Sequence, residues 1–318
     1  MAEVPLGRLA LGTASLGNLY APVSDEQAHA VLEAAWECGI RYFDTAPHYG
    51  LGLAERRLGA FLKTKPRGEY VISTKVGRLL VPDPDGASRL DDANGYHVPA
   101  DHRRVWDFTS AGVRRSLHDS LERLGLDRVD MLYLHDPDEY DLEPALADGL
   151  PAVAALREAG VVAAVGIGSK STKALAAGAR SGVLDLLMVA GRFTLLEQPA
   201  LDDVVPECRA REVGIAAAGV FNSGLLATPT PSADAHYEYA TVPPDVLTTA
   251  REIAALCTEF GVDLPTAALQ YPLREPAVRS VVVGAATPAE VWQNNRRLHA
   301  SVPGELWTTL HDRGLIRT

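Results

Sequence analysis

The chain has 318 residues, of which 47% are hydrophobic and 22% are charged, and its formal net charge is −11. This composition is typical of a protein that buries a large core, and it excludes an intrinsically disordered chain. The acidic balance argues against a nucleic-acid-binding or anionic-membrane surface, and no apolar run approaches the roughly 20 residues that span a bilayer. Three widely spaced cysteines and a first segment without signal-peptide features predict a cytoplasmic protein without a disulfide framework or a metal site.

Eight short apolar runs alternate with longer amphipathic segments along the chain. The runs predict buried strands of a parallel sheet, because their apolar residues follow one another without alternation. In chain order they are Leu9–Gly12, Arg41–Asp44, Tyr70–Lys75, Val129–Leu134, Ala163–Gly168, Leu186–Val189, Gly214–Ala217 and Ser280–Gly284. The segments between and after them predict helices, and they are Asp25–Cys38, Leu53–Leu62, Ser110–Leu124, Pro151–Ala159, Lys173–Ser181, Leu201–Arg211, Asp245–Phe260 and Ala289–Leu298.

Capping residues support the boundaries of several predicted helices. Ser24 and Gln27 have the spacing of a capping box, in which two side chains bond reciprocally to backbone N–H groups. Glycines that can adopt a left-handed backbone conformation are expected to end helices, and they are Gly39, Gly160, Gly182 and Gly214.

The alternation of strands and helices predicts an α/β protein, a (β/α)8 TIM barrel, forming a single domain over residues 1–318. The alternative is a doubly wound open sheet with a second domain. It lacks a linker, and the first strand–helix junction, GTASLG, does not have the GxGxxG pattern of a dinucleotide-binding turn. Two stretches, Leu80–Asp107 and Asn222–Pro244, exceed the usual loop length, and we expect them to form lids or substrate walls at the C-terminal face of the barrel.

Four ionisable residues stand where predicted strands end. Asp44 ends the second run, Lys75 ends the third, His135 follows the fourth, and Tyr49 lies on the loop after Asp44. Because active sites of barrels lie at the carboxyl ends of the strands, we expect these four side chains at one rim.

This set of residues suits proton transfer to a carbonyl oxygen while a hydride reaches the carbon. A buried lysine needs a partner, which Asp44 supplies, and a lysine cation beside a phenol lowers the phenol pKa from its usual value near 10. Tyr49 could then exchange a proton near neutral pH, and His135 could hydrogen-bond the same oxygen. Each residue alone is more often a cap, a turn residue or a satisfied ion pair, but four on separate rim elements favour a catalytic site.

Three stretches around these residues, DTAPHYG, STKVG and LHDPD, closely resemble the motifs of the aldo-keto reductase superfamily. The resemblance extends from LALGTA near the start of the chain to GAATPAEVWQNN near its end. Within the superfamily, the segments STKVGRLLVP, WDFTSAGVRRSLHDSLERLGLDRVDMLYLHDPD and FNSGLLA look like the branch that holds L-fucose (D-threo-aldose), L-galactose and pyridoxal dehydrogenases. The resemblance implies a (β/α)8 barrel that binds a nicotinamide cofactor without a Rossmann domain.

The resemblance also implies roles for the four rim residues, which match the family tetrad residue for residue. Tyr49 would be the proton donor or acceptor, Lys75 and Asp44 its activating pair, and His135 the substrate-orienting group. The implied enzyme is an NAD(P)-dependent oxidoreductase, an aldose 1-dehydrogenase that converts a sugar hemiacetal of the L-fucose, D-arabinose or L-galactose type to a lactone.

Other functions stay open at this point. They are a pyridoxal dehydrogenase, a general aldehyde or ketone reductase, a non-catalytic cofactor-binding subunit of a membrane complex, and a barrel hydrolase or isomerase that uses the same rim residues. We expect a monomer or a small homo-oligomer with a small-molecule carbonyl or sugar substrate.

By resemblance, the cofactor pyrophosphate and adenosine 2′-phosphate would meet the loop and helix start after the eighth strand, at Gly284, Ala285, Ala286 and Thr287. Family members that prefer NADP carry a basic residue at the position of Gly284 and an arginine at that of Glu290. Glu290 would repel a 2′-phosphate and accept hydrogen bonds from a ribose hydroxyl, so NAD is expected to be preferred, with NADP possible. The alternative is that Glu290 is an exposed helix residue while Arg296 or Arg297 reaches the phosphate.

Further cofactor positions follow the family pattern less closely. The usual Ser-Asn pair reads here as Ser169-Lys170, Arg192 lies near the position of a carboxamide-binding glutamine, and Phe221 is the nearest aromatic residue to a nicotinamide-stacking tyrosine. Phe221 is equally compatible with a core position. The remaining candidates are Gly12, Thr13, Asp44, Asn222, Ser223, Leu225 and Asn294.

Aromatic residues near the rim are candidates for the substrate pocket, because their faces suit a sugar ring or a pyridine. The candidates are Tyr20, His48, Trp106 and Phe108. His48 could hydrogen-bond a substrate hydroxyl, whereas Trp106 and Phe108 are equally compatible with anchoring the long loop. Asp136 and Asp138 suggest a metal cluster, but the intervening Pro137 favours a turn.

Overall fold

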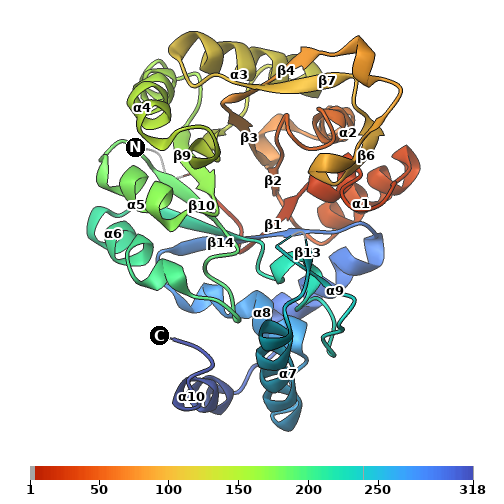
Figure 1. Ribbon diagram of the computed structural model, residues 1–318, viewed down its shortest axis with the longest axis vertical. Coiled ribbons are helices and arrows are strands. Elements are labelled where there is room, and N and C mark those ends of the chain that lie inside the picture. The colour runs from red at the N-terminus through yellow and green to blue at the C-terminus, as the bar shows by residue number, and fades with distance from the viewer. Residues whose placement is uncertain (1–3, 239, 318) are drawn as a thin grey trace.

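A closed barrel of parallel strands forms the centre of the computed structural model, which describes residues 4–238 and 240–317 (Figure 1). The barrel strands are β1 Leu9–Gly12, β2 Tyr42–Asp44, β3 Val71–Val76, β8 Met131–His135, β9 Ala164–Ser169, β10 Leu186–Ala190, β11 Gly214–Ala218 and β14 Val278–Gly284. Around the barrel they follow the order β1, β14, β11, β10, β9, β8, β3, β2. The predicted (β/α)8 barrel is confirmed, and the single-domain boundaries at residues 1 and 318 stay a prediction.

Helices surround the barrel and pack against one another in a ring (Figure 1). Their bounds are α1 Asp25–Glu37, α2 Leu53–Leu62, α3 Ser110–Leu124, α4 Leu142–Glu158, α5 Thr172–Arg180, α6 Val204–Arg211, α7 Pro244–Glu259, α8 Leu264–Gln270, α9 Pro288–His299 and α10 Gly304–Asp312. Within the ring, α1 contacts both α2 and α9, α3 contacts α2 and α4, and α5 contacts α4 and α6. In the described part of the chain, no helix is both long and apolar enough for a transmembrane span.

Two helices, α8 and α10, are not predicted from the sequence. α8 packs beside α9 in the ring, whereas α7, the predicted helix of this region, packs against α8 and α10. Asp263 caps α8, since its Oδ1 accepts a hydrogen bond from Thr266 N at 2.8 Å. Leu264–Leu269 is buried throughout, so α8 lacks the alternation of apolar and polar faces by which a helix is usually recognised.

Two predicted boundaries are wrong. α4 begins at Leu142 rather than at Pro151, and this proline lies inside the helix. Proline is most frequent in the first helical turn, where its missing N–H costs nothing, and this preference made it a misleading start signal. Gly214 lies in β11, and the left-handed position that ends α6 belongs to Glu212, with φ of 57°.

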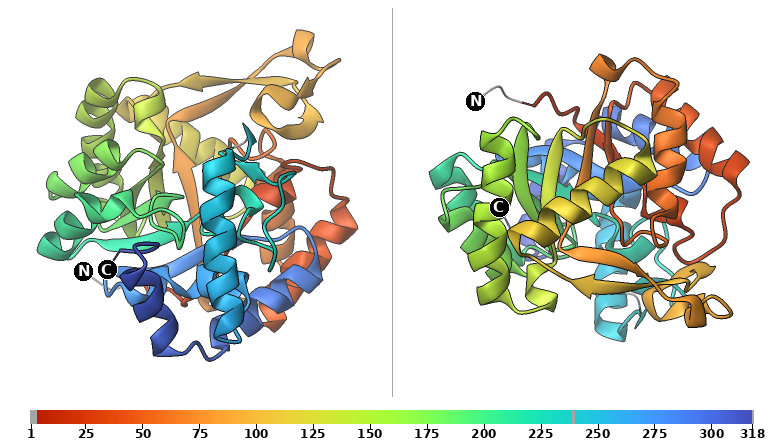
Figure 2. Two further views of the ribbon diagram at one scale, coloured as in Figure 1. Left: turned by 60° about the horizontal axis from the view of Figure 1, so that its bottom comes forward. Right: turned by 90° about the horizontal axis from the view of Figure 1, so that it is seen from above.

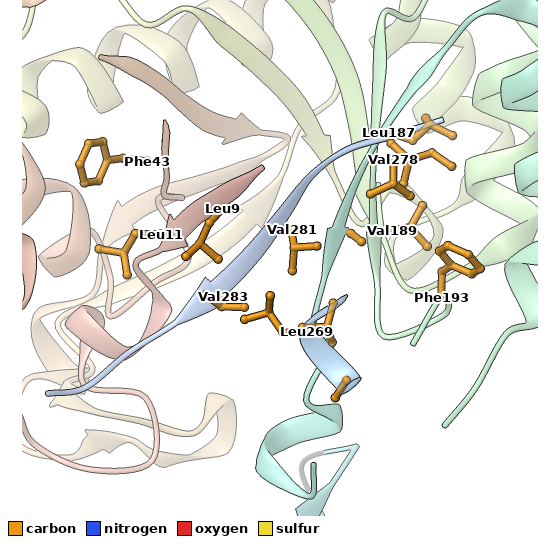
Figure 3. Close-up of a cluster of buried hydrophobic side chains, with 14 of the residues drawn as sticks. Leu9, Leu11, Phe43, Leu187, Val189, Phe193, Leu269, Val278, Val281 and Val283 are labelled. Carbon is orange, nitrogen blue, oxygen red and sulfur yellow. The ribbon is translucent and has the colours of Figure 1, made fainter. Parts of the chain in front are cut away.

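The barrel strands are buried on both faces. Leu9 and Leu11 of β1 lie in one cluster with Val281 and Val283 of β14, between the strands and the helices (Figure 3). Ala10, whose side chain points the opposite way, belongs to a second cluster inside the barrel. Burial on both sides explains why these strands have continuous apolar sequences.

The first long segment, expected as a loop over Leu80–Asp107, is an insertion of two antiparallel strand pairs, one nested within the other, that projects from the barrel (Figure 2). Its strands are β4 Arg78–Pro82, β5 Leu90–Asp91, β6 Tyr96–Pro99 and β7 His102–Trp106. β4 pairs with β7, and β5 pairs with β6. Tyr96 also forms a β-bridge with Leu19, so the insertion is attached to the loop that follows β1.

The second long segment begins with residues 222–238, which we call the strap. It contains β12 (His236–Tyr237), which pairs with β13 (Ala240–Thr241) before α7 begins. The ring of His236 stacks on Tyr20 at a centroid distance of 5.1 Å, and Glu238 Oε2 accepts a hydrogen bond from Lys170 Nζ at 2.6 Å. The strap therefore bridges the loops that follow β1 and β9.

A fully buried carboxylate joins three elements beside the barrel. Glu55 of α2 accepts a hydrogen bond from Thr74 Oγ1 of β3 at 2.8 Å and another from Arg123 Nε of α3 at 2.6 Å. A buried charge is tolerated only when it is paired, so removing Glu55 would leave the Arg123 guanidinium without its counterion.

We expect Glu55→Ala to lower the free energy of unfolding by about 3–5 kcal/mol, the loss typical of breaking a buried ion pair. Urea unfolding followed by circular dichroism measures this change. The control is Asp202→Ala, which removes the exposed partner of Arg317 and should change stability little. Equal losses in the two variants would contradict the structural role of Glu55.

Candidate functional site

The four predicted rim residues lie together at the carboxyl end of the barrel strands. Asp44 ends β2, Lys75 lies near the end of β3, and His135 ends β8. The parallel register pairs Asp44 with Ser73, so Lys75 is the next residue on that face of β3. Tyr49 comes from the loop between β2 and α2.

Lys75 forms a buried ion pair with Asp44. Its Nζ donates hydrogen bonds to Asp44 Oδ2 at 2.6 Å and to Thr45 O at 3.0 Å, and the two charged side chains are only 2% and 3% exposed. The same Nζ lies 4.7 Å from the ring centroid of Tyr49. An ammonium group fixed beside a phenol favours the phenolate, so this arrangement suits proton exchange at the Tyr49 oxygen.

Hydrogen bonds inside the barrel hold Asp44 in place. Ser73 Oγ donates to Asp44 Oδ1 at 2.6 Å, and Tyr42 OH lies 3.2 Å from both Ser73 Oγ and Tyr133 OH. Burial is the main cause that raises the pKa of Tyr42 and Tyr133, so their phenols stay protonated and can donate hydrogen bonds within this network. Both carboxylate oxygens of Asp44 are therefore bonded and its orientation is fixed.

Three aromatic rings meet at the rim. The ring centroids of His48, Tyr49 and His135 are 5.7–6.2 Å apart. Burial lowers the pKa of both histidines well below the usual value, and the cations of Arg78 and Lys75 act in the same direction, so both rings are neutral at pH 7. His135 Nδ1 is buried and has no hydrogen-bond partner among the described residues, which fits a ligand oxygen at this place.

The aspartate that follows His135 belongs to a turn. Asp136 has φ of 44°, and Pro137 then begins a short 3-10 helix, as its sequence predicts. Burial raises the pKa of Asp136 to about 7, although Arg78, which forms ion pairs with Asp136 and Glu139, acts in the opposite direction. Across residues 4–238 and 240–317, no three His, Cys, Asp or Glu side chains are grouped so that they could hold a metal ion.

The predicted phosphate-binding segment forms the N-terminal end of α9. Thr287 is the N-cap and accepts a hydrogen bond from Glu290 N at 3.3 Å, while Glu290 Oε2 accepts one from Ala286 N at 2.7 Å. Gly284 is exposed and Ala285 is buried. A carboxylate therefore occupies the positive end of this helix dipole, where an anionic ligand would otherwise be favoured.

Arg296 and Arg297, the alternative phosphate-binding residues, line a cleft of about 510 Å³ beside α8 and α9, to which the strap contributes Pro229. Arg297 NH1 donates to Asn294 Oδ1 at 3.2 Å, and its Nε lies 3.7 Å from the Asp263 carboxylate. Arg297 is thus already engaged by protein groups, and the α9 residues that line this cleft come from the middle and the C-terminal end of the helix rather than from its start.

The strap supplies several predicted cofactor positions. Asn222 Nδ2 donates to Glu197 Oε2 at 2.9 Å, and Asn222 Oδ1 is buried without a partner in the described part of the chain. Such an orphaned acceptor fits a ligand that brings an N–H or O–H donor. Ser223 is partly exposed, Phe221 packs at the edge of the core, and Leu225 is fully buried, so only the Leu225 backbone could meet a ligand.

Ser169 and Arg192 are bonded to other side chains of the protein. Ser169 Oγ donates to Asp138 Oδ1 at 2.6 Å. Arg192 lies 3.2 Å from the carboxylate of Glu238 in the strap and 3.7 Å from that of Glu197. These two candidate residues therefore contribute to the contacts that hold the strap and the neighbouring turn.

Gly12 connects the tetrad to the predicted phosphate-binding segment. Its strand register pairs it with Asp44 on one side and with Gly284 on the other. Thr13, the next residue, is buried, and both its N and its Oγ1 donate to Asp44 O, at 2.9 Å and 3.0 Å. The ends of β2, β1 and β14 thus lie side by side at the rim. A ligand placed there could reach both the tetrad and the predicted phosphate-binding segment.

The structure places the predicted substrate residues in different surroundings. His48 adjoins the tetrad, whereas Tyr20 stacks on the strap. The rings of Trp106 and Phe108 stack at 5.9 Å, and Phe108 is only 3% exposed, so its place is in the core. Trp106 lines a cleft of about 380 Å³ formed mainly by residues of the insertion, and the Arg78 guanidinium lies 4.4 Å above its ring.

Two arginines near the site are missed by the sequence analysis. Arg78 and Arg104 lie within or beside the stretch that was expected to form a loop, where charged residues are usually solvated. Arg104 donates to His48 Nδ1 at 2.6 Å and forms two hydrogen bonds with Asp91 at 2.6 Å and 2.9 Å. The available signal was the concentration of arginines in a segment expected to line the active-site end.

Comparisons with known proteins agree with this geometry. The chain is 54% identical over 318 residues to a D-threo-aldose 1-dehydrogenase from a Pseudomonas species, covering 100% of this chain and 97% of that protein. It is 39% identical over 325 residues to a pyridoxal 4-dehydrogenase from Microbacterium luteolum, covering 97% and 94% of the two chains.

The fold matches a solved structure of a glycerol dehydrogenase from Gluconobacter oxydans with a TM-score of 0.75, 22% identity and coverage of 98% of this chain and 92% of that one. At this identity the likeness shows the fold alone. Residues 8–311 match the model of the aldo/keto reductase family. With the full-length relatives and the closed barrel, this match shows that the chain is an oxidoreductase and belongs to the aldo/keto reductase family.

Proposed function

We propose that this protein oxidises the anomeric carbon of an aldose and yields a lactone. The observation that carries the proposal is the buried Lys75–Asp44 ion pair beside the ring of Tyr49. Its full-length similarity to a D-threo-aldose 1-dehydrogenase supports an aldose of that kind, such as L-fucose or D-arabinose, as substrate. Oxidoreductases of this family use NAD(P)H, and two of the buried polar atoms that lack a partner in the described part of the chain, on His135 and Asn222, fit a bound ligand.

The proposed reaction needs a base at the anomeric hydroxyl. Oxidation of the sugar removes a proton from the anomeric hydroxyl and a hydride from the anomeric carbon. A nicotinamide cofactor, when bound, accepts the hydride. Tyr49 takes the proton on its phenolate oxygen. The Lys75 ammonium stabilises this phenolate, and Asp44 holds the ammonium in position.

His135 orients the reacting oxygen in this proposal. A neutral imidazole whose N–H faces the oxygen can donate a hydrogen bond to it both as a hydroxyl and as a carbonyl. Burial keeps the ring neutral, as the lowered pKa requires. The histidine therefore does not compete with Tyr49 for the proton near neutral pH.

We also propose that NAD is preferred to NADP. Support comes from the Glu290 carboxylate at the N-terminal end of α9 and from Gly284, where no cation is available. A 2′-phosphate would be repelled by this carboxylate, whereas a ribose hydroxyl can donate a hydrogen bond to it. Gly12, Thr13, Ser169, Arg192 and the strap residues stay candidates for the remaining contacts.

A pyridoxal dehydrogenase is the second candidate, because a pyridoxal 4-dehydrogenase is 39% identical over nearly the full chain. A general aldehyde or ketone reductase and a non-catalytic cofactor-binding subunit are further alternatives. Measuring nicotinamide absorbance with a panel of aldoses, pyridoxal and simple aldehydes distinguishes them. A cytoplasmic location and a monomeric or small homo-oligomeric state also stay predictions.

We expect Tyr49→Phe to lower kcat for aldose oxidation by about 10²- to 10⁴-fold, because the base is removed while the ring remains. Cofactor affinity, measured by quenching of protein fluorescence, should change little. The control is Tyr140→Phe on the exposed turn after β8, which should keep wild-type kcat. Turnover retained by Tyr49→Phe would refute the proposed base.

The cofactor preference is tested by kcat/KM with NAD and with NADP at one aldose concentration series. We expect NAD to be preferred, and Glu290→Gln to raise kcat/KM with NADP about tenfold, because the amide keeps the cap but removes the charge. Glu305→Gln in the first turn of α10 is the matched control and should leave the ratio unchanged. A wild-type preference for NADP would contradict the proposal.

The lowered histidine pKa values predict how stability depends on pH. Below about pH 6.5 the unfolded chain binds protons at His48 and His135 that the folded site excludes, so the free energy of unfolding falls as the pH falls. Each histidine contributes a slope of up to about 1.4 kcal/mol per pH unit until its folded-state pKa is reached. Urea unfolding between about pH 7.5 and pH 5.5 measures the slope.

His135→Gln should remove one such contribution from this slope. Asp136 acts with the opposite sign, because its raised folded-state pKa gives a contribution that is lost as the pH rises through about 7. Asp136 is present in wild type and in the variant, and its carboxylate lies 3.4 Å from His135 Nε2 in wild type. His118→Gln, on the exposed face of α3, is the control and should retain the wild-type slope. A wild-type slope in His135→Gln would show that this ring is not kept neutral.

A further inference from the structure

An arginine from the insertion determines which nitrogen of His48 carries the proton. Arg104 Nε lies 2.6 Å from His48 Nδ1, and a guanidinium group can only donate hydrogen bonds. His48 Nδ1 must therefore present its lone pair. Since burial and the nearby cations lower the pKa of His48 well below its usual value, the ring is neutral and its single proton lies on Nε2.

Asp91 fixes Arg104 for this task. The two NH groups of Arg104 bond to the two carboxylate oxygens of Asp91 at 2.9 Å and 2.6 Å, and the side chains are 14% and 7% exposed. Arg104 NH2 also donates to His48 O at 3.0 Å, so the arginine holds the histidine at two points. Such a planar fork cannot be reproduced by a lysine.

The Nε2–H of His48 has no acceptor in the described part of the chain, and the side chain is half-buried rather than sealed. Its ring lies edge-on to those of Tyr96 at 5.4 Å and His135 at 5.7 Å, and it is 6.2 Å from the ring of Tyr49. A substrate oxygen placed between Tyr49 and His135 would thus have its neighbouring atoms next to His48.

We propose that Arg104, held by Asp91, is a positioning residue that fixes His48 as an Nε2–H donor to the hydroxyl on the carbon next to the reacting carbon. The proposal rests on the proposed aldose oxidation. It adds that this hydroxyl of the substrate is recognised by His48, which the insertion orients through Arg104. A site built to hydrogen-bond a hydroxyl discriminates against an analogue that lacks it, because the buried donor is then left unpaired. The preferred substrates are aldoses that carry a hydroxyl on the carbon next to the anomeric carbon.

The test compares L-fucose with 2-deoxy-L-fucose in each variant. The measured quantity is kcat/KM for L-fucose divided by kcat/KM for 2-deoxy-L-fucose. We expect this ratio to be about tenfold higher in wild type than in His48→Phe, which keeps an aromatic ring but has no donor. Arg104→Lys should lose much of this preference too. Arg103→Leu, the exposed neighbour on β7, is the matched control and should keep the wild-type ratio. Comparing two sugars within one variant cancels a general loss of activity.

A spectroscopic measurement separates positioning from structural support. In protein with 15N-labelled histidine, His48 Nδ1 of wild type should give the signal of an unprotonated nitrogen, and Arg104→Lys should shift it towards a mixture of tautomers. A protonated Nδ1 in wild type, or an unchanged sugar ratio in His48→Phe, would overturn the proposal. If wild type oxidises no aldose, the proposed function fails instead, and the 15N spectrum still decides the assignment to Arg104.

Discussion

The buried ion pair between Lys75 and Asp44 is the interaction on which the rest of the site depends. A charge in the interior of a barrel is unfavourable unless its partner and its remaining hydrogen bonds are in place. Here the register between β2 and β3 brings the two side chains together, and Thr45 O and Ser73 Oγ complete their bonding. The barrel interior therefore contains a polar layer of Tyr42, Ser73 and Tyr133 directly beneath the rim. Without this layer the carboxylate could not be both buried and oriented.

The remaining parts of the site come from outside the barrel strands. The insertion reaches back to the rim through Arg78, which pairs with Asp136, and through Arg104, which donates to His48 Nδ1. The strap crosses from β11 towards the loops after β1 and β9 and contacts Tyr20, among others. The strand ends and the loop after β2 thus carry Asp44, Lys75, His135 and Tyr49, while the insertion and the strap contribute groups around them. This division explains how one barrel can keep its chemistry while its substrate range changes with the segments above it.

The features that could be predicted from the sequence are those that depend on residues close together along the chain. Buried strands, amphipathic helices and polar residues at strand ends are local signals, so the barrel and the grouping of Asp44, Tyr49, Lys75 and His135 follow from them. α8 could not be recognised, because it is buried on every side and has no polar face. The bond between Arg104 and His48 joins residues 56 positions apart, across an insertion whose hairpins have no strong local signal, and only the folded chain brings them together.

The Glu290 side chain links the stability of α9 to the proposed choice of cofactor. Its carboxylate completes the cap of α9 by accepting the Ala286 N–H, and it is also the charge that would face an adenosine phosphate in the proposed cofactor site. Replacing it with a cationic residue to admit a phosphate would leave Thr287 as the N-cap, but it would remove this hydrogen bond and put a positive charge at the positive end of the helix dipole, at a cost of about 1 kcal/mol. α9 packs against both α1 and α8, so that cost would weaken the place where the helical ring closes. At this position, a substitution that admitted the adenosine phosphate of NADP would therefore also lower the stability of the helical ring.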